Sequence, residues 1–210
     1  MPRKETIIFD LGGVLIDWDP HYLYRKIFPT EAEVNWFLET VCTQKWNEQQ
    51  DAGRSFAKGI EELVLKFPAH EKAINAWFDR WDETIGGPKE ETVHVLRSIR
   101  DMNQYRLYAL TNWSAETFPW ALSKFDFLSW FDGIVVSGVE KALKPHPEFF
   151  HILFDRYSVD PNTSIFIDDN IKNVETARLL GMDSIHFLNA SQLREEFLRR
   201  GMLIRDSESK

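Results

Sequence analysis

Four short apolar runs in this sequence each end on a polar or charged residue. The runs are Thr6–Phe9, Tyr105–Leu110, Gly133–Val136 and Ser164–Ile167. Short apolar runs bounded in this way are typical of strands buried on both faces. Stretches with helical spacing alternate with them, over residues 90–102, 147–157, 171–180 and 190–200. A fifth strand is predicted over residues 184–187. The alternation predicts an α/β fold, a Rossmann-like parallel sheet flanked by helices.

The segment over residues 17–86 interrupts this alternation. It contains no convincing strand, and its apolar residues recur at helical spacing in several short stretches. The turn-forming sequence Gly86-Gly87-Pro88 then returns the chain to the sheet pattern. We therefore predict an α/β core built from residues 1–16 and 87–210. An all-helical cap over residues 17–86 is inserted after the first strand.

Composition narrows the choice of partners and compartment. Hydrophobic residues make up 43% of the 210 residues and charged residues 28%, which is ordinary for a globular chain. The net charge of −8 and the lack of a basic stripe argue against nucleic acid and membrane surfaces as partners. A single cysteine, Cys42, excludes an internal disulfide, and no apolar run reaches the length of a membrane span. We expect a cytoplasmic location and a small buried thiol at Cys42.

Polar residues at and near the ends of the predicted strands define a candidate site. The carboxyl ends of parallel strands share one edge of the sheet, where ligands bind. The residues expected to converge there are Asp10, Thr111, Asn112, Lys144, Asp168 and Asp169. Asp10 is suited to act as a nucleophile or a metal ligand, and Lys144 to neutralise negative charge. Two adjacent carboxylates at a strand end repel each other, and a hard cation such as Mg²⁺ relieves that repulsion.

The same segments resemble the four motifs of the haloacid dehalogenase (HAD) superfamily, in order. They are Ile8–Leu15 (IFDLGGVL), Leu110-Thr111-Asn112, Lys144–Glu148 (KPHPE) and Phe166–Asn170 (FIDDN). The likeness spans residues 7 to 187, and residues 17–86 fall where members of this family carry a helical cap. Four motifs in order are highly specific for the fold and less so for the substrate. The resemblance is to helical-cap phosphatases with an Asp-x-Gly first motif, some of which act on sugar phosphates.

The resemblance implies a Mg²⁺-dependent phosphatase that hydrolyses a small phosphorylated metabolite, as a monomer or homodimer. Asp10 attacks the phosphoryl group and forms an aspartyl-phosphate, which water then hydrolyses. Thr111 and Asn112 hold the phosphoryl oxygens, and Lys144 pairs with Asp10 and the phosphate. The expected Mg²⁺ ligands are Asp10, the Gly12 carbonyl, Asp169, and Asp168 directly or through water.

One position departs from the family pattern. Most phosphatases of the family have a second aspartate two residues after the nucleophile, which serves as general acid and base, and this chain has Gly12 there. A positioned acid or base contributes about 10²–10⁴-fold. We therefore expect slow turnover or a preference for activated phosphates, unless Asp17 or a cap residue carries the proton. Among the cap tryptophans, Trp18 and Trp46 are the ones expected to face the site.

Two other functions remain open at this point. A metal-independent 2-haloacid dehalogenase uses the same aspartate and also lacks the second one, although the pair Asp168-Asp169 is a metal motif and dehalogenases differ there. A sugar-phosphate mutase is a weaker hypothesis, because its reaction needs the general acid and base that is missing at Gly12. The third class is a weakly active or non-catalytic binding protein that kept the fold, and the intact Asp10, Thr111 and Lys144 argue against it.

Overall fold

The computed structural model describes residues 5–202, and its centre is a parallel sheet of five strands in the order β5-β4-β1-β6-β7. The strands are β1 (Thr6–Phe9), β4 (Arg106–Thr111), β5 (Gly133–Val136), β6 (Ser164–Asp168) and β7 (Asp183–His186). β1 lies between β4 and β6, with Phe9 level with Ala109 and Ile167. This register brings the carboxyl ends of the three strands to one edge. The predicted α/β fold is confirmed.

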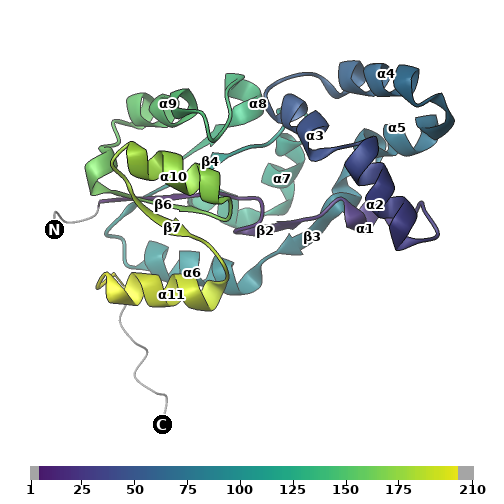
Figure 1. The fold of residues 1–210 in the computed structure, drawn as a ribbon. Helices are drawn as coiled ribbons and strands as arrows, with labels where there is room; N and C mark the ends of the chain where they lie inside the picture. The colour runs from purple at the N-terminus through teal and green to yellow at the C-terminus, as the bar shows by residue number, and fades with distance from the viewer. Residues whose placement is uncertain (1–4, 203–210) are drawn as a thin grey trace, which may run out of the picture.

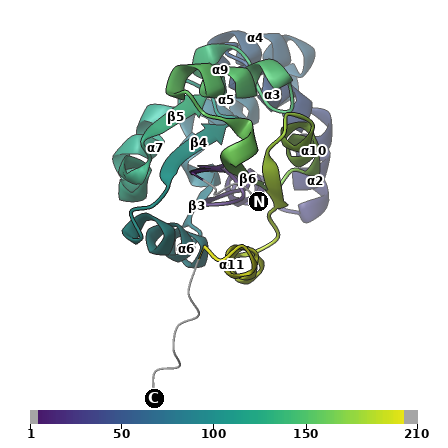
Figure 2. The ribbon, with the colours of Figure 1, turned by 90° about the vertical axis from the view of Figure 1, so that its left-hand side faces the viewer.

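Helices cover both faces of the sheet. α9 (Pro147–Tyr157) and α10 (Ile171–Leu179) lie on one face, and α6 (Glu90–Asp101) and α11 (Ala190–Arg199) lie on the other (Figures 1 and 2). Alternate side chains of β1 enter the two cores, since Ile8 joins the cluster with α9 and α10 while its neighbours join the other. The helices α7 (Phe118–Lys124) and α8 (Ser137–Glu140), together with 3-10 turns over Asp126–Trp130 and Pro161–Thr163, complete this part.

The segment between β1 and α6, which we call the insert, carries a separate group of short helices beside the carboxyl end of the sheet (Figure 1). They are α1 (His21–Tyr24), α2 (Glu31–Thr40), α3 (Gln44–Asp51), α4 (Phe56–Lys66) and α5 (Glu71–Asp79), with 3-10 turns over Pro68–His70 and Trp81–Thr84. Side-chain caps begin three of them, at Thr30, Thr43 and Ser55.

The expectation that the insert contains no strand is wrong at its two ends. β2 (Ile16–Trp18) and β3 (Ile85–Pro88) pair antiparallel as a narrow ribbon through which the chain leaves and re-enters the sheet region. The strands have three and four residues, and Gly86 and Gly87 carry no strand preference, so the pattern reads as a turn. Within residues 5–202, no helix is long and apolar enough to cross a membrane.

Candidate active site

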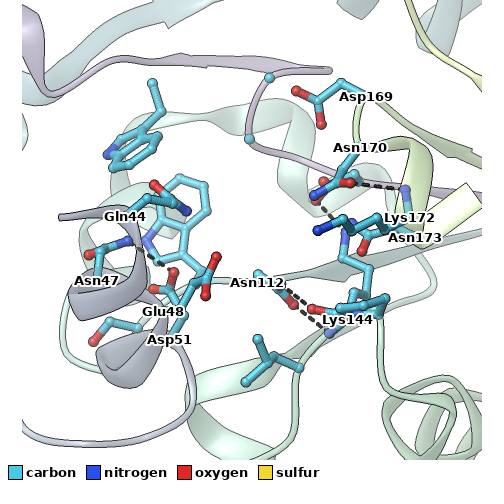
Figure 3. Close-up of a pocket in the computed structure, with 18 of the residues that line it drawn as sticks. Gln44, Asn47, Glu48, Asp51, Asn112, Lys144, Asp169, Asn170, Lys172 and Asn173 are labelled. Atoms are coloured by element: carbon cyan, nitrogen blue, oxygen red, sulfur yellow. Dashed lines mark hydrogen bonds and ion pairs between the residues drawn. The ribbon is translucent and has the colours of Figure 1, made fainter. Parts of the chain in front are cut away.

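A pocket of about 580 Å³ lies between the carboxyl edge of the sheet and the insert, and both parts line it (Figure 3). Of the residues predicted from sequence, those that line it are Asp10, Gly12, Asn112, Lys144 and Asp169. Thr111 and Asp168 stand behind the pocket wall, with no exposure to solvent. The structure thus brings together the strand ends that the sequence separates by up to 159 residues, from Asp10 to Asp169.

Lys144 is the centre of this arrangement. Its Nζ lies 2.9 Å from Oδ1 of Asp10 and 2.7 Å from Oδ2 of Asp168. The Asn112 side chain fixes its backbone twice, donating to the Lys144 carbonyl at 2.9 Å and accepting from the Lys144 N–H at 2.9 Å. Asn112, predicted to hold a phosphoryl oxygen, therefore serves in this structure to position the lysine.

Asp168 has both carboxylate oxygens engaged by the protein. Oδ1 accepts from the Asn170 backbone N–H at 2.8 Å, and the Asn173 side chain donates to both oxygens at 3.0 Å. With Lys144 on Oδ2, the carboxylate is held in one orientation. Its contribution is to aim Lys144 at Asp10. The Asn170 side chain accepts from the backbone N–H of Lys172 and so caps α10. The helix therefore begins directly behind the site.

Burial and charge act against each other here. Burial raises the pKa of Asp10 well above its usual range, Lys144 opposes this, and Asp168 and Asp169 add to it. Burial alone would lower the pKa of Lys144, but the Asp10 and Asp168 carboxylates outweigh burial and raise it. Burial also raises the pKa of Asp169, and the neighbouring Asp168 adds to that shift. The lysine therefore stays charged, whereas Asp10 and Asp169 need further positive charge beside them to stay ionised.

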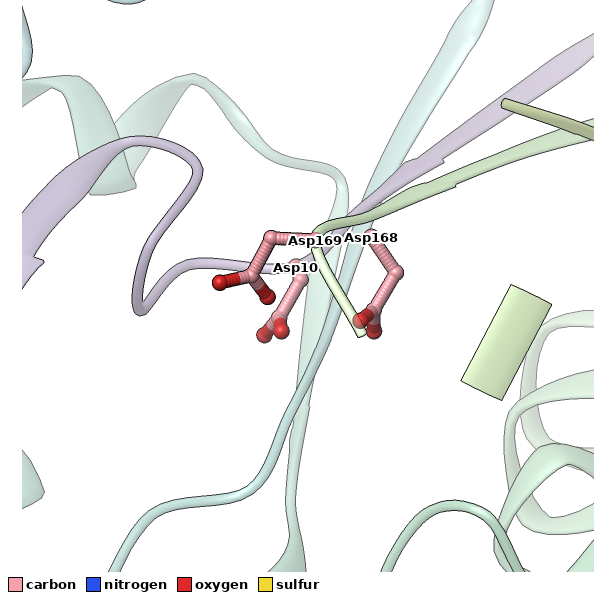
Figure 4. Close-up of side chains that lie close together, drawn as sticks. All are labelled: Asp10, Asp168 and Asp169. Atoms are coloured by element: carbon pink, nitrogen blue, oxygen red, sulfur yellow. The ribbon is translucent and has the colours of Figure 1, made fainter. Parts of the chain in front are cut away.

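The three carboxylates fit a divalent cation. Oxygen atoms of Asp10, Asp168 and Asp169 lie within 4.8 Å of one another. Figure 4 shows the carboxylates of Asp10 and Asp169 gathered on one side, with that of Asp168 turned away from them. Three carboxylates and one ammonium leave two negative charges, which a hard dication with oxygen ligands matches. Because Asp168 is engaged elsewhere, Asp10 and Asp169 are the carboxylates best placed to bind it.

The loop after Asp10 is shaped around Asp169. Gly13 has φ of +73°, and a Cβ there would collide with the Asp169 carboxylate. Only glycine fits both the conformation and the space. Close by, the Thr111 hydroxyl is buried and has no hydrogen-bond partner among the described residues. An unpaired buried hydroxyl directly behind the pocket wall is a donor that still lacks an acceptor.

The insert side of the pocket is formed by a polar face of α3, which the sequence analysis missed. The side chains on that face are Gln44, Asn47, Glu48 and Asp51, and they point across the pocket toward Asn112 and Lys144 (Figure 3). Their spacing of three, one and three residues places them on one side of a helix. No sequence signal marks this face, because the burial of Asn47 and Gln50 on α3 appears only once the insert is folded. Trp18 and Trp81 line the same side.

The structure also places the two tryptophans, Asp17 and Cys42 that the sequence singled out. Trp18 lines the pocket as expected, but Trp46 does not, because it is buried within the insert and donates to the Gly59 carbonyl at 3.1 Å. Asp17 is not among the lining residues, and it accepts from the Tyr22 hydroxyl at 2.7 Å. Cys42 is the small buried thiol expected, and burial raises its pKa to about 12.

The fold and this site together define a hydrolase of the HAD type. The sequence profile of the haloacid dehalogenase-like hydrolases matches residues 4–181. The chain belongs to this family and is an enzyme of it, which confirms the resemblance of its four motifs.

Individual relatives are distant but cover most of the chain. A D-ribitol-5-phosphate phosphatase from Bacteroides thetaiotaomicron is 24% identical over 204 residues, covering 91% of this chain and 96% of that protein. A sesquiterpene phosphatase from Aspergillus oryzae is 26% identical over 191 residues, covering 89% of this chain and 91% of that protein. In a drimenol cyclase from Aspergillus calidoustus, 24% identical over 194 residues, the match covers 91% of this chain and only 35% of that protein.

Solved structures confirm the fold. A HAD family enzyme from Bacteroides thetaiotaomicron in a magnesium complex has a TM-score of 0.71 at 21% identity, covering 93% of this chain and 98% of that one. L-2-haloacid dehalogenase from Xanthobacter autotrophicus has a TM-score of 0.60 at 14% identity, covering 96% of this chain and 85% of that one. Because a dehalogenase shares the fold while the sequence relatives include phosphatases, the choice between the chemistries depends on the site.

Proposed function

We propose that this protein is a Mg²⁺-dependent phosphatase that hydrolyses a small phosphate monoester through an aspartyl-phosphate on Asp10. The observation that carries the proposal is the pairing of Lys144 with Asp10 at 2.9 Å inside a pocket that also holds Asp169. A nucleophilic carboxylate next to a buried cation and a second carboxylate suits phosphoryl transfer, which depends mainly on positioning and charge neutralisation.

In the first half-reaction, an Asp10 carboxylate oxygen forms a bond to phosphorus as the bond from phosphorus to the leaving oxygen breaks. Lys144 orients Asp10 and favours its ionised form against burial, and the lysine charge stabilises the phosphoryl oxygens. The free Thr111 hydroxyl is available to donate to one of these oxygens. In the second half-reaction, water attacks phosphorus and the electron pair of the Asp10–phosphorus bond returns to the carboxylate.

Asp10, Asp169 and the Gly12 carbonyl would hold Mg²⁺, and Asp168 would support it by fixing Lys144. The bound ion supplies positive charge that neutralises the phosphate dianion and the two carboxylates. The net negative charge of the three aspartates and one lysine supports this assignment. It also argues against a metal-independent dehalogenase, which would have to leave the charge on Asp169 uncompensated.

The leaving group is proposed to be a polyol or a sugar. The pocket has the size of a site for a small metabolite. The α3 face offers amides at Gln44 and Asn47 and a carboxylate at Glu48, which can donate to and accept from hydroxyl groups. Trp18 and Trp81 provide flat apolar surface beside them. A relative of similar length is named a D-ribitol-5-phosphate phosphatase, which supports the same class.

The test is phosphate release from a panel of esters with and without Mg²⁺, for the wild type and Asp10→Asn. The panel holds D-ribitol 5-phosphate, glucose 1-phosphate, glucose 6-phosphate, 2-phosphoglycolate and p-nitrophenyl phosphate. Release that needs the metal and is lost in Asp10→Asn is expected. No release from any ester, or release unchanged in Asp10→Asn, would refute the proposal, and halide release from 2-haloacids without metal would then be measured. The cytoplasmic location and the monomeric or homodimeric state stay predictions.

A further inference from the structure

Gly12 leaves an open space at the position where most phosphatases of the family carry their second aspartate. Gly12 lines the pocket, and a Cβ built on it would meet no atom within 4 Å. A leaving oxygen with a high proton affinity still needs a proton when its bond to phosphorus breaks. The nearest alternative named from the sequence, Asp17, is not among the residues lining the pocket. The proton must come from another group in this pocket.

The pocket offers few such groups. Asp10, Lys144 and Asp169 are assigned to the phosphate and the metal. The other titratable side chains among the described lining residues are Glu48, Asp51, His146 and Lys172. Three of these are exposed to solvent, whereas Asp51 is half-buried. Partial shielding favours exchange of its proton with a bound substrate over exchange with bulk water.

Asp51 is held in place by contacts on both sides of the pocket. Its Oδ2 accepts from the Asn47 side chain at 3.0 Å within α3. The backbone of Ser114, on the loop that follows Asn112, faces the Asp51 carboxylate and lowers its pKa. Asp51 therefore joins the insert to the loop that positions Lys144. Figure 3 shows it on the α3 side of the pocket, across from the lysine.

Several features favour the protonated form of this side chain. Burial raises the pKa of Asp51 to about 7; Glu48, one turn earlier on the same face, adds to the shift, and the Ser114 backbone opposes it. Asp51 is also the last residue of α3, where the negative end of the helix dipole disfavours a carboxylate. An acid that is partly protonated near neutral pH is well suited to give and take a proton in turn.

We propose that Asp51 is the general acid and base of this enzyme, supplied by the insert in place of the aspartate missing at Gly12. This inference rests on the proposed phosphatase function. As the bond from phosphorus to the leaving oxygen breaks, the electron pair goes to that oxygen, which takes the proton of Asp51. When water then attacks the aspartyl-phosphate, its proton passes to the Asp51 carboxylate, and Asp10 is released. Asp51 ends each cycle protonated, as it began.

The experiment compares two leaving groups in Asp51→Asn. The substrates are the fastest alkyl phosphate of the panel and p-nitrophenyl phosphate, whose leaving group needs no proton. The quantity compared is kcat/KM, which reports formation of the aspartyl-phosphate and not its later hydrolysis, a step that both esters share. We expect kcat/KM for the alkyl ester to fall by about 10²–10⁴-fold, with less than a tenfold change for the nitrophenyl ester. Asp51→Ser, a smaller side chain without a carboxyl group, serves as a second variant if the asparagine does not fold. Equal losses on both esters would show a packing role and overturn the assignment, as would no loss on either.

Two further variants sharpen the comparison. Glu61→Gln removes an exposed carboxylate of α4 that does not line this pocket, and its effect should be the same for both esters. Gly12→Asp in the Asp51→Asn chain restores an acid in the open space, and it should recover at least tenfold of the alkyl activity. A failure of that recovery would count against Asp51. A wild type that cleaves only p-nitrophenyl phosphate would overturn this inference but leave the phosphatase proposal intact, whereas no release from any ester overturns both.

Discussion

The Nζ atom of Lys144 lies 2.7 Å from Oδ2 of Asp168, and neither side chain is exposed to solvent. Both groups are thus withdrawn from water and depend on each other for charge compensation. Lys144 also contacts Asp10, so the buried pair orients the carboxylate that we propose as the nucleophile. Loss of the Lys144 ammonium should therefore lower stability as well as activity.

Replacing the lysine should destabilise the fold. Lys144→Met leaves Asp10 and Asp168 buried without a counter-charge, and breaking a buried pair on one side costs about 3–5 kcal/mol. Urea unfolding at pH 8 without metal measures this. Lys124→Met is the control, because Lys124 is exposed at the end of α7, and its effect should stay within about 0.5 kcal/mol. Equal stability of the two variants would contradict the buried pairing.

Metal binding should be visible without any substrate. A ligand at a hundred times its dissociation constant stabilises the native state by about 2.7 kcal/mol, and Tm rises by about 2–4 °C per kcal/mol in a domain of this size. We expect Mg²⁺ to raise Tm by several degrees in the wild type. Asp169→Asn should abolish the shift, whereas Asp155→Asn, an exposed position on α9, should retain it. A shift that survives in Asp169→Asn would place the ion elsewhere.

The sequence predicts the sheet well because its three central strands are almost wholly buried and its edge strands are also largely apolar. Gly133–Val136 has the predicted bounds, and Tyr105–Leu110 is shifted by one residue to Arg106–Thr111. In such strands, apolar residues and a polar end mark the limits without reference to the rest of the molecule. The short ribbon of β2 and β3 escapes detection because its strands are defined by pairing with each other rather than by composition.

The site divides in the same way. The core half could be predicted because Asp10, Lys144 and Asp169 occur at strand ends or within local motifs. The insert half could not, because the residues of α3 that face the pocket depend on how the insert packs against the core. Asp51 is one acid among many in the sequence, and its place in the pocket and its bond from Asn47 set it apart only in the folded chain. Asn112 similarly changes role once its two bonds to the Lys144 backbone are known.

The environment of Asp51 also predicts a pH-dependent gain in stability for Asp51→Asn. The folded pKa is about 7 and the unfolded value about 4, so ionisation of Asp51 favours the unfolded chain as pH rises through this range. Below about pH 4, Asp51 is protonated in both the folded and the unfolded chain, and its ionisation no longer affects the free energy of unfolding. The variant should therefore gain most relative to the wild type at pH 8, by at most about 4 kcal/mol and by less to the extent that solvent reaches the group. Thermal unfolding of both proteins at pH 5 and pH 8 checks this, and a gain that is equal at both values would contradict the raised pKa.

The charge on the insert side of the pocket predicts discrimination against anionic leaving groups. Glu48 faces the pocket from α3, and among the described lining residues the insert contributes no lysine or arginine. Two like charges at about 4 Å oppose each other by about 1 kcal/mol in water and about 4 kcal/mol near a protein surface. The kcat/KM for 2-phosphoglycolate should therefore be at least about tenfold below that for D-ribitol 5-phosphate, since about 1.4 kcal/mol corresponds to a factor of ten. In Glu48→Lys the ratio should narrow or reverse, mainly through KM for phosphoglycolate, while Lys58→Glu on the exposed side of α4 should leave it unchanged. If phosphoglycolate is the better substrate of the wild type, the carboxylate of Glu48 does not face the leaving group.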